Sequence, residues 1–406
     1  MHLTAVVNIH RRFDVHARRC TEPSQVSGTG KTLRGTGARS TARAAHSGVH
    51  GGIPRPRRLP MKTAAYAATA ADRPLAPFTL ERREPGPHDV AIDILYCGLC
   101  HSDILQTRNE LGRSRYPMVP GHEIVGRVAR VGIGVTRFEA GDIVGVGGMV
   151  DSCRECLHCR EGHEQFCQKG AASTYNGTEM DRKTFTYGGY SKHIVVAEPF
   201  VLKIPTSLDP AAAAPLLCAG ITTYSALRQW NVKRGDHVGV VGLGGLGHLA
   251  VKIAAAMGAE VTMLSTSRAK EADARRLGAQ HFALTTEPEA LDRLAHSFDV
   301  VLDTVASPQH QYGRYLSTLK PFGTLVVLGL TAPSAISGLS LIMGNKRIAG
   351  SAIGGIRENQ EMLDFCGEHG IVSDIEMVSA SGINDAYERM TRSDVRYRFV
   401  LDTATM

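Results

Sequence analysis

No stretch of this sequence approaches the roughly 18 apolar residues in a row that a helix needs to cross a bilayer. The N-terminal region also lacks the apolar core of a secretory signal. We therefore expect a cytoplasmic chain with neither a membrane-spanning segment nor a membrane partner.

Acidic residues are scarce in only one part of the chain. Residues 1–60 hold ten arginines and one lysine against Asp14 and Glu22, which is a net +9 in a chain of net +7, so the other 346 residues together carry −2. The basic charge therefore belongs to an Arg-, Gly- and Ser-rich extension, and it does not predict a nucleic-acid partner for the rest of the chain.

The extension has few features of a folded or functional segment. A mitochondrial transit peptide is similarly Arg-rich and acid-poor, but the Gly and Pro content here weakens any amphipathic helix. The stretch 28–32, Gly-Thr-Gly-Lys-Thr, resembles half of a phosphate loop, but Gln25 stands where the motif needs a glycine. We interpret residues 1–60 as a disordered, dispensable extension, with Met61 as the effective start.

The length of 406 residues predicts two domains. Alternating polar and apolar residues at Val90–Tyr96 and Ile124–Val131 predict half-buried strands. Glycines that we expect at corners separate the short strands of this region and predict a barrel-like β domain; they are Gly132, Gly134, Gly141, Gly145, Gly147 and Gly148.

Beyond about Pro210 apolar strands alternate with helices, which predicts a parallel, doubly wound sheet. The expected elements are His237–Val241, Leu246–Met257, Val261–Leu264, Ala269–Leu277, Asp299–Leu302 and Thr324–Leu328. After Gly350 the pattern is mixed again, with a helix near Glu358–His369 and a last strand at Arg398–Leu401. We therefore expect a nucleotide-binding domain at 213–350, inserted into a β domain made of 61–212 and 351–406.

A glycine-rich turn follows the strand at His237–Val241 and precedes the next helix. In such a turn the first glycine allows the tight bend, the second lets the backbone approach a pyrophosphate, and the third lets helix and strand pack closely. The helix N-terminus then offers its free N–H groups to the phosphates. We expect a dinucleotide at this turn, on Gly242, Gly244, Gly245, Leu246 and Gly247.

The end of the following strand indicates which dinucleotide binds. An NAD site usually has a carboxylate there for the ribose 2′-hydroxyl, but this chain has none between Leu264 and Lys270. Hydroxyl and cationic side chains stand there instead, and they suit a 2′-phosphate. We predict NADP(H), bound by Ser265, Thr266, Ser267, Arg268 and Lys270.

Four of the nine cysteines lie within fifteen residues, which in a chain without an export signal favours a metal over disulfides. Four thiolates make a closed tetrahedral site, so we predict a structural zinc; an iron–sulfur cluster is the competing interpretation. The ligands are Cys153, Cys156, Cys159 and Cys167.

A second metal set is dispersed over the sequence. Cys100, His122 and Cys218 would make a two-cysteine, one-histidine site with an open fourth position. From the residues alone, a structural histidine and a core cysteine fit these positions as well.

The chain resembles the zinc-dependent medium-chain alcohol dehydrogenases, in particular the cinnamyl alcohol dehydrogenase branch and its bacterial NADP-dependent aldehyde reductases. The resemblance runs from Met61 to the end. It is carried by Cys97–Asp103, Tyr116–Gly126, the four-cysteine segment, Gly188–Ser191, Ala214–Thr222, the glycine turn and Asp394–Val400.

The resemblance implies a GroES-like β-barrel catalytic domain with an inserted Rossmann sheet, two zinc ions per chain, and a homodimer or homotetramer. It implies Cys100, His122 and Cys218 as the ligands of the catalytic zinc. It gives further roles to other residues: Glu123 behind the metal or as a transient ligand, Asp103 orienting His122, Ser102 nearest the substrate oxygen, His101 at the cofactor pyrophosphate and Thr222 near the nicotinamide.

One position departs from the family pattern. A histidine commonly stands five residues after the first zinc cysteine and ends the proton relay, but this chain has Leu105 there. The relay must therefore end at Ser102 and the ribose hydroxyls, pass to water, or use His101.

The implied function is hydride transfer between NADP(H) and a primary alcohol or its aldehyde, mainly as reduction of aromatic, cinnamyl-type or medium-chain aldehydes. The nearest alternatives are other enzymes of this fold, such as a polyol dehydrogenase or a zinc-free quinone reductase. A zinc-free relative would have lost Cys100 and the cysteine cluster, and this chain keeps both. A nucleic-acid-binding zinc ribbon is disfavoured, because the charged neighbours of the four cysteines sum to −2. A non-catalytic scaffold would hold one zinc instead of two.

Overall fold

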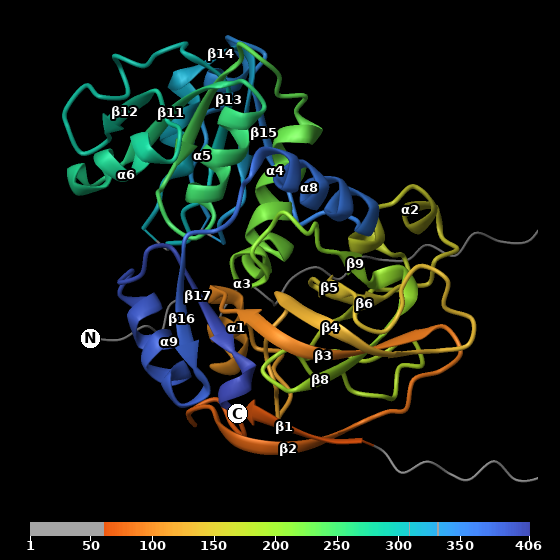
Figure 1. Cartoon of the computed structure of the whole chain (residues 1–406). Coiled ribbons are helices and arrows are strands. Elements are labelled where there is room, and N and C mark those ends of the chain that lie inside the picture. The colour runs from red at the N-terminus through yellow and green to blue at the C-terminus, as the bar shows by residue number, and fades with distance from the viewer. Residues whose placement is uncertain (1–60, 308, 331–332) are drawn as a thin grey trace, which may run out of the picture. The chain divides into compact units, whose positions relative to one another are not determined.

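The computed structural model describes residues 61–307, 309–330 and 333–406 (Figure 1). The expectations for residues 1–60 lie outside the described residues. Two large sheets organise the described part, one of seven strands and one of six.

The seven-stranded sheet forms the β domain. Its strands run in the order β16-β17-β3-β4-β5-β9, with β8 paired to β3, and all neighbours are antiparallel except β16 and β17. Alternate residues of β3, namely Val90, Ile92 and Ile94, are buried in the core of this domain, as one face of a strand requires. The strands are β3 (Asp89–Gly98), β4 (Ile124–Val131), β5 (Ile143–Val146), β8 (His193–Ala197), β9 (Leu202–Lys203), β16 (Ile375–Ser379) and β17 (Arg398–Asp402).

Smaller elements complete this domain. Two hairpin-like pairs, β1 (Met61–Ala67) with β2 (Ala76–Arg82) and β6 (Met149–Asp151) with β7 (Ala172–Ser173), lie beside the main sheet. The helices of these segments are α1 (His101–Thr107), α2 (Leu157–Arg160), α8 (Ile356–His369) and α9 (Ile383–Thr391).

The six-stranded sheet is parallel throughout and has the order β12-β11-β10-β13-β14-β15. This is the order of a doubly wound dinucleotide-binding sheet, in which the ligand crevice opens at the carboxyl ends of the two central strands, β10 and β13. Its strands are β10 (His237–Val241), β11 (Glu260–Ser265), β12 (His281–Leu284), β13 (Phe298–Asp303), β14 (Leu319–Val327) and β15 (Arg347–Gly350).

Some helices of this region pack on the six-stranded sheet, and others precede its first strand in the sequence. α5 contacts β10 and β11, and α6 contacts β12, as Figure 1 shows. The helices are α3 (Pro210–Ala213), α4 (Ala219–Gln229), α5 (Gly247–Ala256), α6 (Glu271–Arg276) and α7 (Gly338–Ile342).

The predicted fold class, a β-barrel domain with an inserted doubly wound sheet, is confirmed, and two local expectations need correction. Gly145 does not form a corner: it lies inside β5, where a Cβ would come 2.9 Å from Ile204 and 3.0 Å from Leu217. The expected helix Ala269–Leu277 begins as a 3-10 turn at Arg268–Lys270 and becomes α-helical only at Glu271.

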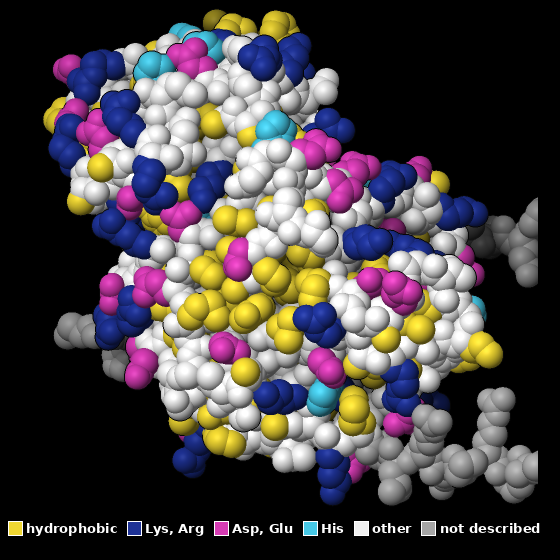
Figure 2. All heavy atoms as spheres, viewed as in Figure 1, with side chains coloured by type: hydrophobic (Ala, Val, Ile, Leu, Met, Phe, Trp, Pro, Cys, Tyr) yellow, Lys and Arg dark blue, Asp and Glu magenta, His cyan; other side chains and the backbone are white. Residues whose placement is uncertain are grey.

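No single helix among the described residues is long and apolar enough to cross a membrane. One bent pair, Pro210–Leu217 with Ala219–Gln229, passes such a test by length and composition, and most of its side chains are buried in the core of the chain. On the face that Figure 2 shows, cationic and anionic side chains are interspersed over the described residues.

Candidate active site and metal centres

Three dispersed residues converge on one point. Cys100 precedes α1, His122 lies just before β4, and Cys218 lies between a buried 3-10 turn and α4. The Cys100 and Cys218 sulfurs are 4.0 Å apart, and these two, a His122 nitrogen and a Glu123 oxygen all lie within 4.8 Å of one another. Two sulfurs bound to one tetrahedral zinc at about 2.3 Å each lie about 3.8 Å apart, so the donor set fits zinc.

The environment of Cys100 favours its thiolate form. A hydrogen bond from the Cys218 thiol, and then the nearby His122, hold the pKa of Cys100 well below its usual range. Thiolates are the form that binds metal, so the local electrostatics agree with the geometry.

Asp103 fixes the orientation of His122. Its Oδ1 lies 3.0 Å from His122 Nδ1, and the carboxylate also accepts hydrogen bonds from the Cys100 backbone N–H at 2.9 Å and the Tyr190 hydroxyl at 3.2 Å. Asp103 and Tyr190 are fully buried. Because Nδ1 is engaged by the carboxylate, His122 Nε2 is the nitrogen left for a metal.

Behind the cluster lies a buried ion pair between Glu123 and Arg398. Arg398 donates to Glu123 Oε1 and, at 2.9 Å, to the Leu99 carbonyl oxygen. The other carboxylate oxygen, Oε2, is buried without a hydrogen-bond partner among the described residues. Burial raises the pKa of Glu123 to about 7, against the opposing charge of Arg398. A buried carboxylate oxygen without a donor, beside two sulfurs and an imidazole, fits a place behind a cation.

The remaining residues predicted around the metal have distinct positions. The Ser102 hydroxyl lies 3.2 Å from the Cys100 sulfur and 3.5 Å from His122 Nε2. His101 is exposed at the first position of α1, and Leu105 is half-buried on the same helix.

A cavity of about 420 Å³ opens beside this cluster. Ser102 and His122 form part of its wall, together with residues from the loop after α1 and from 173–176. A substrate held in this cavity would contact the Ser102 hydroxyl.

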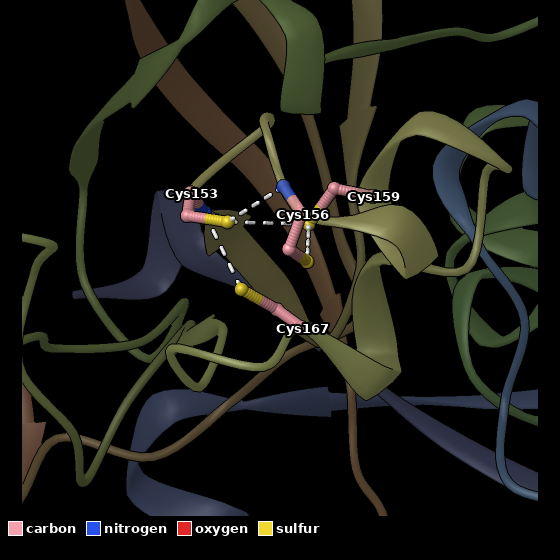
Figure 3. Close-up of side chains that lie close together, drawn as sticks. All are labelled: Cys153, Cys156, Cys159 and Cys167. Carbon is pink, nitrogen blue, oxygen red and sulfur yellow. Dashed lines mark hydrogen bonds between the residues drawn. The ribbon is translucent and has the colours of Figure 1, made fainter. Parts of the chain in front are cut away.

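The other four predicted thiols also meet, in the loop between β6 and β7. Figure 3 shows their sulfurs converging. The Cys159 sulfur lies 3.9 Å from that of Cys153 and 3.5 Å from that of Cys156, distances far longer than a disulfide bond and close to those of a shared zinc. The Cys153 backbone N–H donates to the Cys167 sulfur at 3.5 Å, as expected for sulfurs that carry negative charge.

The glycine turn has the geometry that a pyrophosphate requires. Gly242 has φ of +88°, and a Cβ on Gly247 would lie 1.9 Å from the Gly242 carbonyl oxygen, so both positions need glycine. A Cβ on Gly244 would meet nothing within 4 Å among the described residues, so this side of the turn is open. A Cβ on Gly245 would come 3.0 Å from the Arg398 side chain, which links the turn to the ion pair behind the metal cluster.

The residues predicted to bind the 2′-phosphate follow β11 closely. Ser265 is buried at the strand end and hydrogen-bonds to the Ser267 backbone N–H at 3.2 Å, and Thr266 is exposed. Lys270 donates to the Leu243 carbonyl oxygen in the glycine turn at 2.8 Å. Arg268 instead pairs with Glu287 at 2.5 Å and with Glu271 at 3.4 Å. Thr222 is buried in α4, four residues after Cys218.

Sequence reasoning gave no role to Arg398, Tyr190 or the cavity-lining Arg113. The only signal for Arg398 in the sequence is a charge at the start of an apolar strand, within a segment that carries the family resemblance. The contact between Tyr190 and Asp103 spans 87 residues, so no local pattern could have predicted it.

Comparisons with known families and proteins agree with this geometry. Residues 86–206 match the alcohol dehydrogenase GroES-like domain, and residues 245–368 match the zinc-binding dehydrogenase family. An NADP-dependent alcohol dehydrogenase C of Mycolicibacterium smegmatis is 55% identical over 344 residues, which are 84% of this chain and 98% of that protein. An aldehyde reductase of Escherichia coli is 51% identical, over 85% of this chain and 99% of its own length.

Solved structures give the same picture. A cinnamyl alcohol dehydrogenase of Sorghum bicolor superposes with a TM-score of 0.82 at 45% identity, over 85% of this chain and 98% of that one. A cinnamyl alcohol dehydrogenase of Helicobacter pylori, complexed with NADP(H), has a TM-score of 0.78 at 38% identity, over 85% and 99%.

Proposed function

Because the chain belongs to the zinc-dependent medium-chain alcohol dehydrogenases, we propose that Cys100, His122 and Cys218 hold the zinc ion at which its aldehyde substrate is reduced. The predicted reaction class and cofactors are confirmed by the relatives: the enzyme transfers hydride between NADP(H) and alcohols or aldehydes, and it uses zinc. The single observation that carries the ligand assignment is the convergence of these donor atoms within 4.8 Å.

Bound zinc supplies Lewis acidity toward the carbonyl oxygen, and NADPH supplies the hydride. Ser102 lies at the cavity wall beside two of the metal ligands, and its hydroxyl delivers a proton to the substrate oxygen. Asp103 holds His122 in the tautomer that leaves Nε2 for the metal. Because Leu105 cannot carry a proton, the proton that Ser102 gives up would be replaced from the ribose hydroxyls of the cofactor, from water, or through His101.

Glu123 and Arg398 connect the metal cluster to the cofactor turn. Glu123 Oε2, which has no hydrogen-bond partner among the described residues, would serve as an outer partner or a transient ligand of the metal, while Oε1 accepts a hydrogen bond from Arg398. Arg398 also lies against Gly245, so its position depends on both sites.

The cofactor contacts come from three segments. The glycine turn and the N-terminus of α5 would hold the pyrophosphate together with His101, and Thr222 would contact the nicotinamide end. Ser265, Thr266, Ser267, Arg268 and Lys270 would bind the 2′-phosphate. To bind this phosphate, the Arg268 guanidinium must exchange its ion pairs with Glu287 and Glu271 for one with the phosphate. Both of these ion pairs are exposed and therefore weak.

The substrates are primary alcohols and aldehydes of aromatic, cinnamyl-type or medium-chain structure, with aldehyde reduction as the main direction. A cavity of about 420 Å³ supports this range, because a cavity of roughly 150 Å³ already accepts benzene. Nucleic acid and membranes are not partners in this proposal.

The domain limits that we propose are 61–212 with 351–406 for the catalytic domain, and 213–350 for the cofactor domain. The six parallel strands all lie inside the second range, and the seven strands of the barrel sheet lie outside it.

We place the enzyme in the cytoplasm and infer that it assembles as a homodimer or homotetramer. None of the eight described cysteines forms a disulfide, which suits a reducing compartment. The helix α7, its C-terminal end and the loop before it carry a group of exposed apolar side chains, close in sequence to the edge strand β15 and suited to a second copy of the chain; these are Leu330, Ile336, Leu339, Ile342 and Met343.

Kinetics of two cysteine variants test the ligand assignment. We expect Cys218→Ala to lose aldehyde reduction by at least about a thousandfold while staying folded, because loss of zinc removes several kcal/mol of charge stabilisation. Cys366→Ala, a matched control at a buried cysteine outside both clusters, should keep its activity. Full activity in Cys218→Ala would refute the assignment.

A further inference from the structure

The cavity beside the metal cluster has one permanently charged side chain in its wall. Ser102 and His122, which lie at the metal cluster, line it, and so does Arg113, an exposed residue on the loop after α1. No aspartate or glutamate is among the lining residues. The full lining is Ser102, Gln106, Leu111, Arg113, Ser114, His122, Gly148, Ser173, Thr174, Tyr175, Asn176 and Ile353.

Arg113 has no ionic partner among the described residues, and its guanidinium makes no hydrogen bond to any of them. Of its neighbours in sequence, Arg108 has an ionic partner, Glu388. Arg115, which has no ionic partner among the described residues, lies over the Phe185 ring at 5.7 Å and does not line the cavity. A guanidinium that lines a substrate cavity and has no carboxylate beside it is available to a ligand anion.

The backbone that carries Arg113 is held on its C-terminal side by side-chain hydrogen bonds. The Ser114 N–H donates to Asn109 Oδ1 at 2.9 Å, and the Arg115 N–H donates to Asn176 Oδ1 at 3.0 Å. Asn176 in turn donates to Gln106 Oε1 at 2.8 Å. The loop is thus tied to α1 and to the opposite cavity wall, so binding an anion at Arg113 needs little reordering of the backbone.

We propose that Arg113 makes this enzyme prefer aldehydes whose far end carries a carboxylate over neutral aldehydes of the same size. The planar guanidinium pairs with a carboxylate through two parallel N–H···O bonds. A phosphate carries more negative charge than a carboxylate, and the single cation in this wall would neutralise it less completely. We therefore favour a carboxylate as the ligand group. The inference rests on the proposed function, because it assumes that the reacting carbonyl lies at the Ser102 and His122 end of the cavity.

The test compares para-formylbenzoate with its neutral isostere para-formylbenzamide, each reduced by the zinc-loaded enzyme with NADPH. The quantity measured is the ratio of kcat/KM for the acid to kcat/KM for the amide, because intrinsic reactivity differences cancel when this ratio is compared between variants. Arg113→Gln should lower the ratio about two- to fivefold, the range for an exposed ion pair. The loss should lie in KM, since the guanidinium is remote from the reacting carbon.

Arg115→Gln is the matched control, because it removes the same charge two residues away and outside the cavity. It should leave the ratio unchanged. The same ratio in wild type and in Arg113→Gln, with both aldehydes reduced, would overturn the role of Arg113 and leave the proposed function standing. Failure of the wild type to reduce either aldehyde would overturn both.

Discussion

The buried imidazole of His248 predicts how the free energy of unfolding changes as the pH falls. It follows Gly247 on α5, with Nδ1 3.1 Å from the Gly244 carbonyl oxygen and Nε2 2.9 Å from the Ser373 hydroxyl. The ring is fully buried and stacks on Tyr397 at 5.1 Å. The imidazole thus joins the cofactor turn to the segment that precedes β16, and it does so as a neutral ring that donates to the carbonyl and accepts from the hydroxyl.

Burial, and then the charges of Lys252 and Arg398, lower the pKa of His248 from 6.5 to about 3. Above pH 6.5 the residue is neutral in the folded and the unfolded chain, and its full contribution to stability is present. Below that pH the unfolded chain takes up a proton that the folded chain does not, so the free energy of unfolding falls until the pH reaches about 3. At about pH 5 the loss is roughly 2 kcal/mol, because each pH unit within this window is worth about 1.4 kcal/mol.

The assay is denaturant unfolding of the wild type and of His248→Gln at about pH 8 and about pH 5. Other histidines and the zinc ligands also respond to acid, but they do so in both proteins, and the difference between the two isolates His248. We expect the wild type to lose about 2 kcal/mol more than the variant between these pH values. Equal losses in both proteins would refute the assignment of a buried, neutral imidazole.

Three further predictions concern the site and its assembly. Tyr190→Phe removes the hydroxyl that donates to Asp103, and it should weaken zinc binding at the catalytic site about tenfold in a chelator competition while leaving the four-cysteine zinc in place; unchanged competition would exclude a positioning role for Tyr190. Gly247→Ala places a methyl group against the Gly242 carbonyl oxygen and should raise the Kd for NADPH at least about tenfold without loss of zinc; wild-type affinity would contradict the tight turn. Ile342→Glu puts a charge into the exposed apolar group near β15 and should lower the mass measured by light scattering to that of a monomer; an unchanged mass would place the contact between copies elsewhere.

Local patterns predicted the cofactor domain well, because its determinants lie close together in sequence. The strand His237–Val241 has the predicted bounds, and the glycine turn and α5 follow it directly. The four-cysteine cluster is similarly local, since one short loop holds all of its sulfurs. Gly145 was misjudged because a glycine in a strand under close packing looks, in sequence, like a glycine at a corner.

The catalytic site depends on long-range contacts that no periodic pattern in the sequence predicts. Cys100 and Cys218 are 118 residues apart in sequence, and only the family resemblance favoured a shared metal site with His122 over a structural histidine and a core cysteine. The pairing of Glu123 with Arg398 spans 275 residues and joins two separate strand regions of the barrel sheet. Such contacts are set by the packed sheet, so they could be recognised only in the structure.

Metal analysis of the dialysed protein tests the central claim, an open zinc site on Cys100, His122 and Cys218 beside a closed site on four cysteines. We expect two zinc ions per wild-type chain and one per chain of Cys218→Ala, because two remaining ligands cannot hold the ion against dialysis. One zinc in the wild type, or two in Cys218→Ala, would contradict the account.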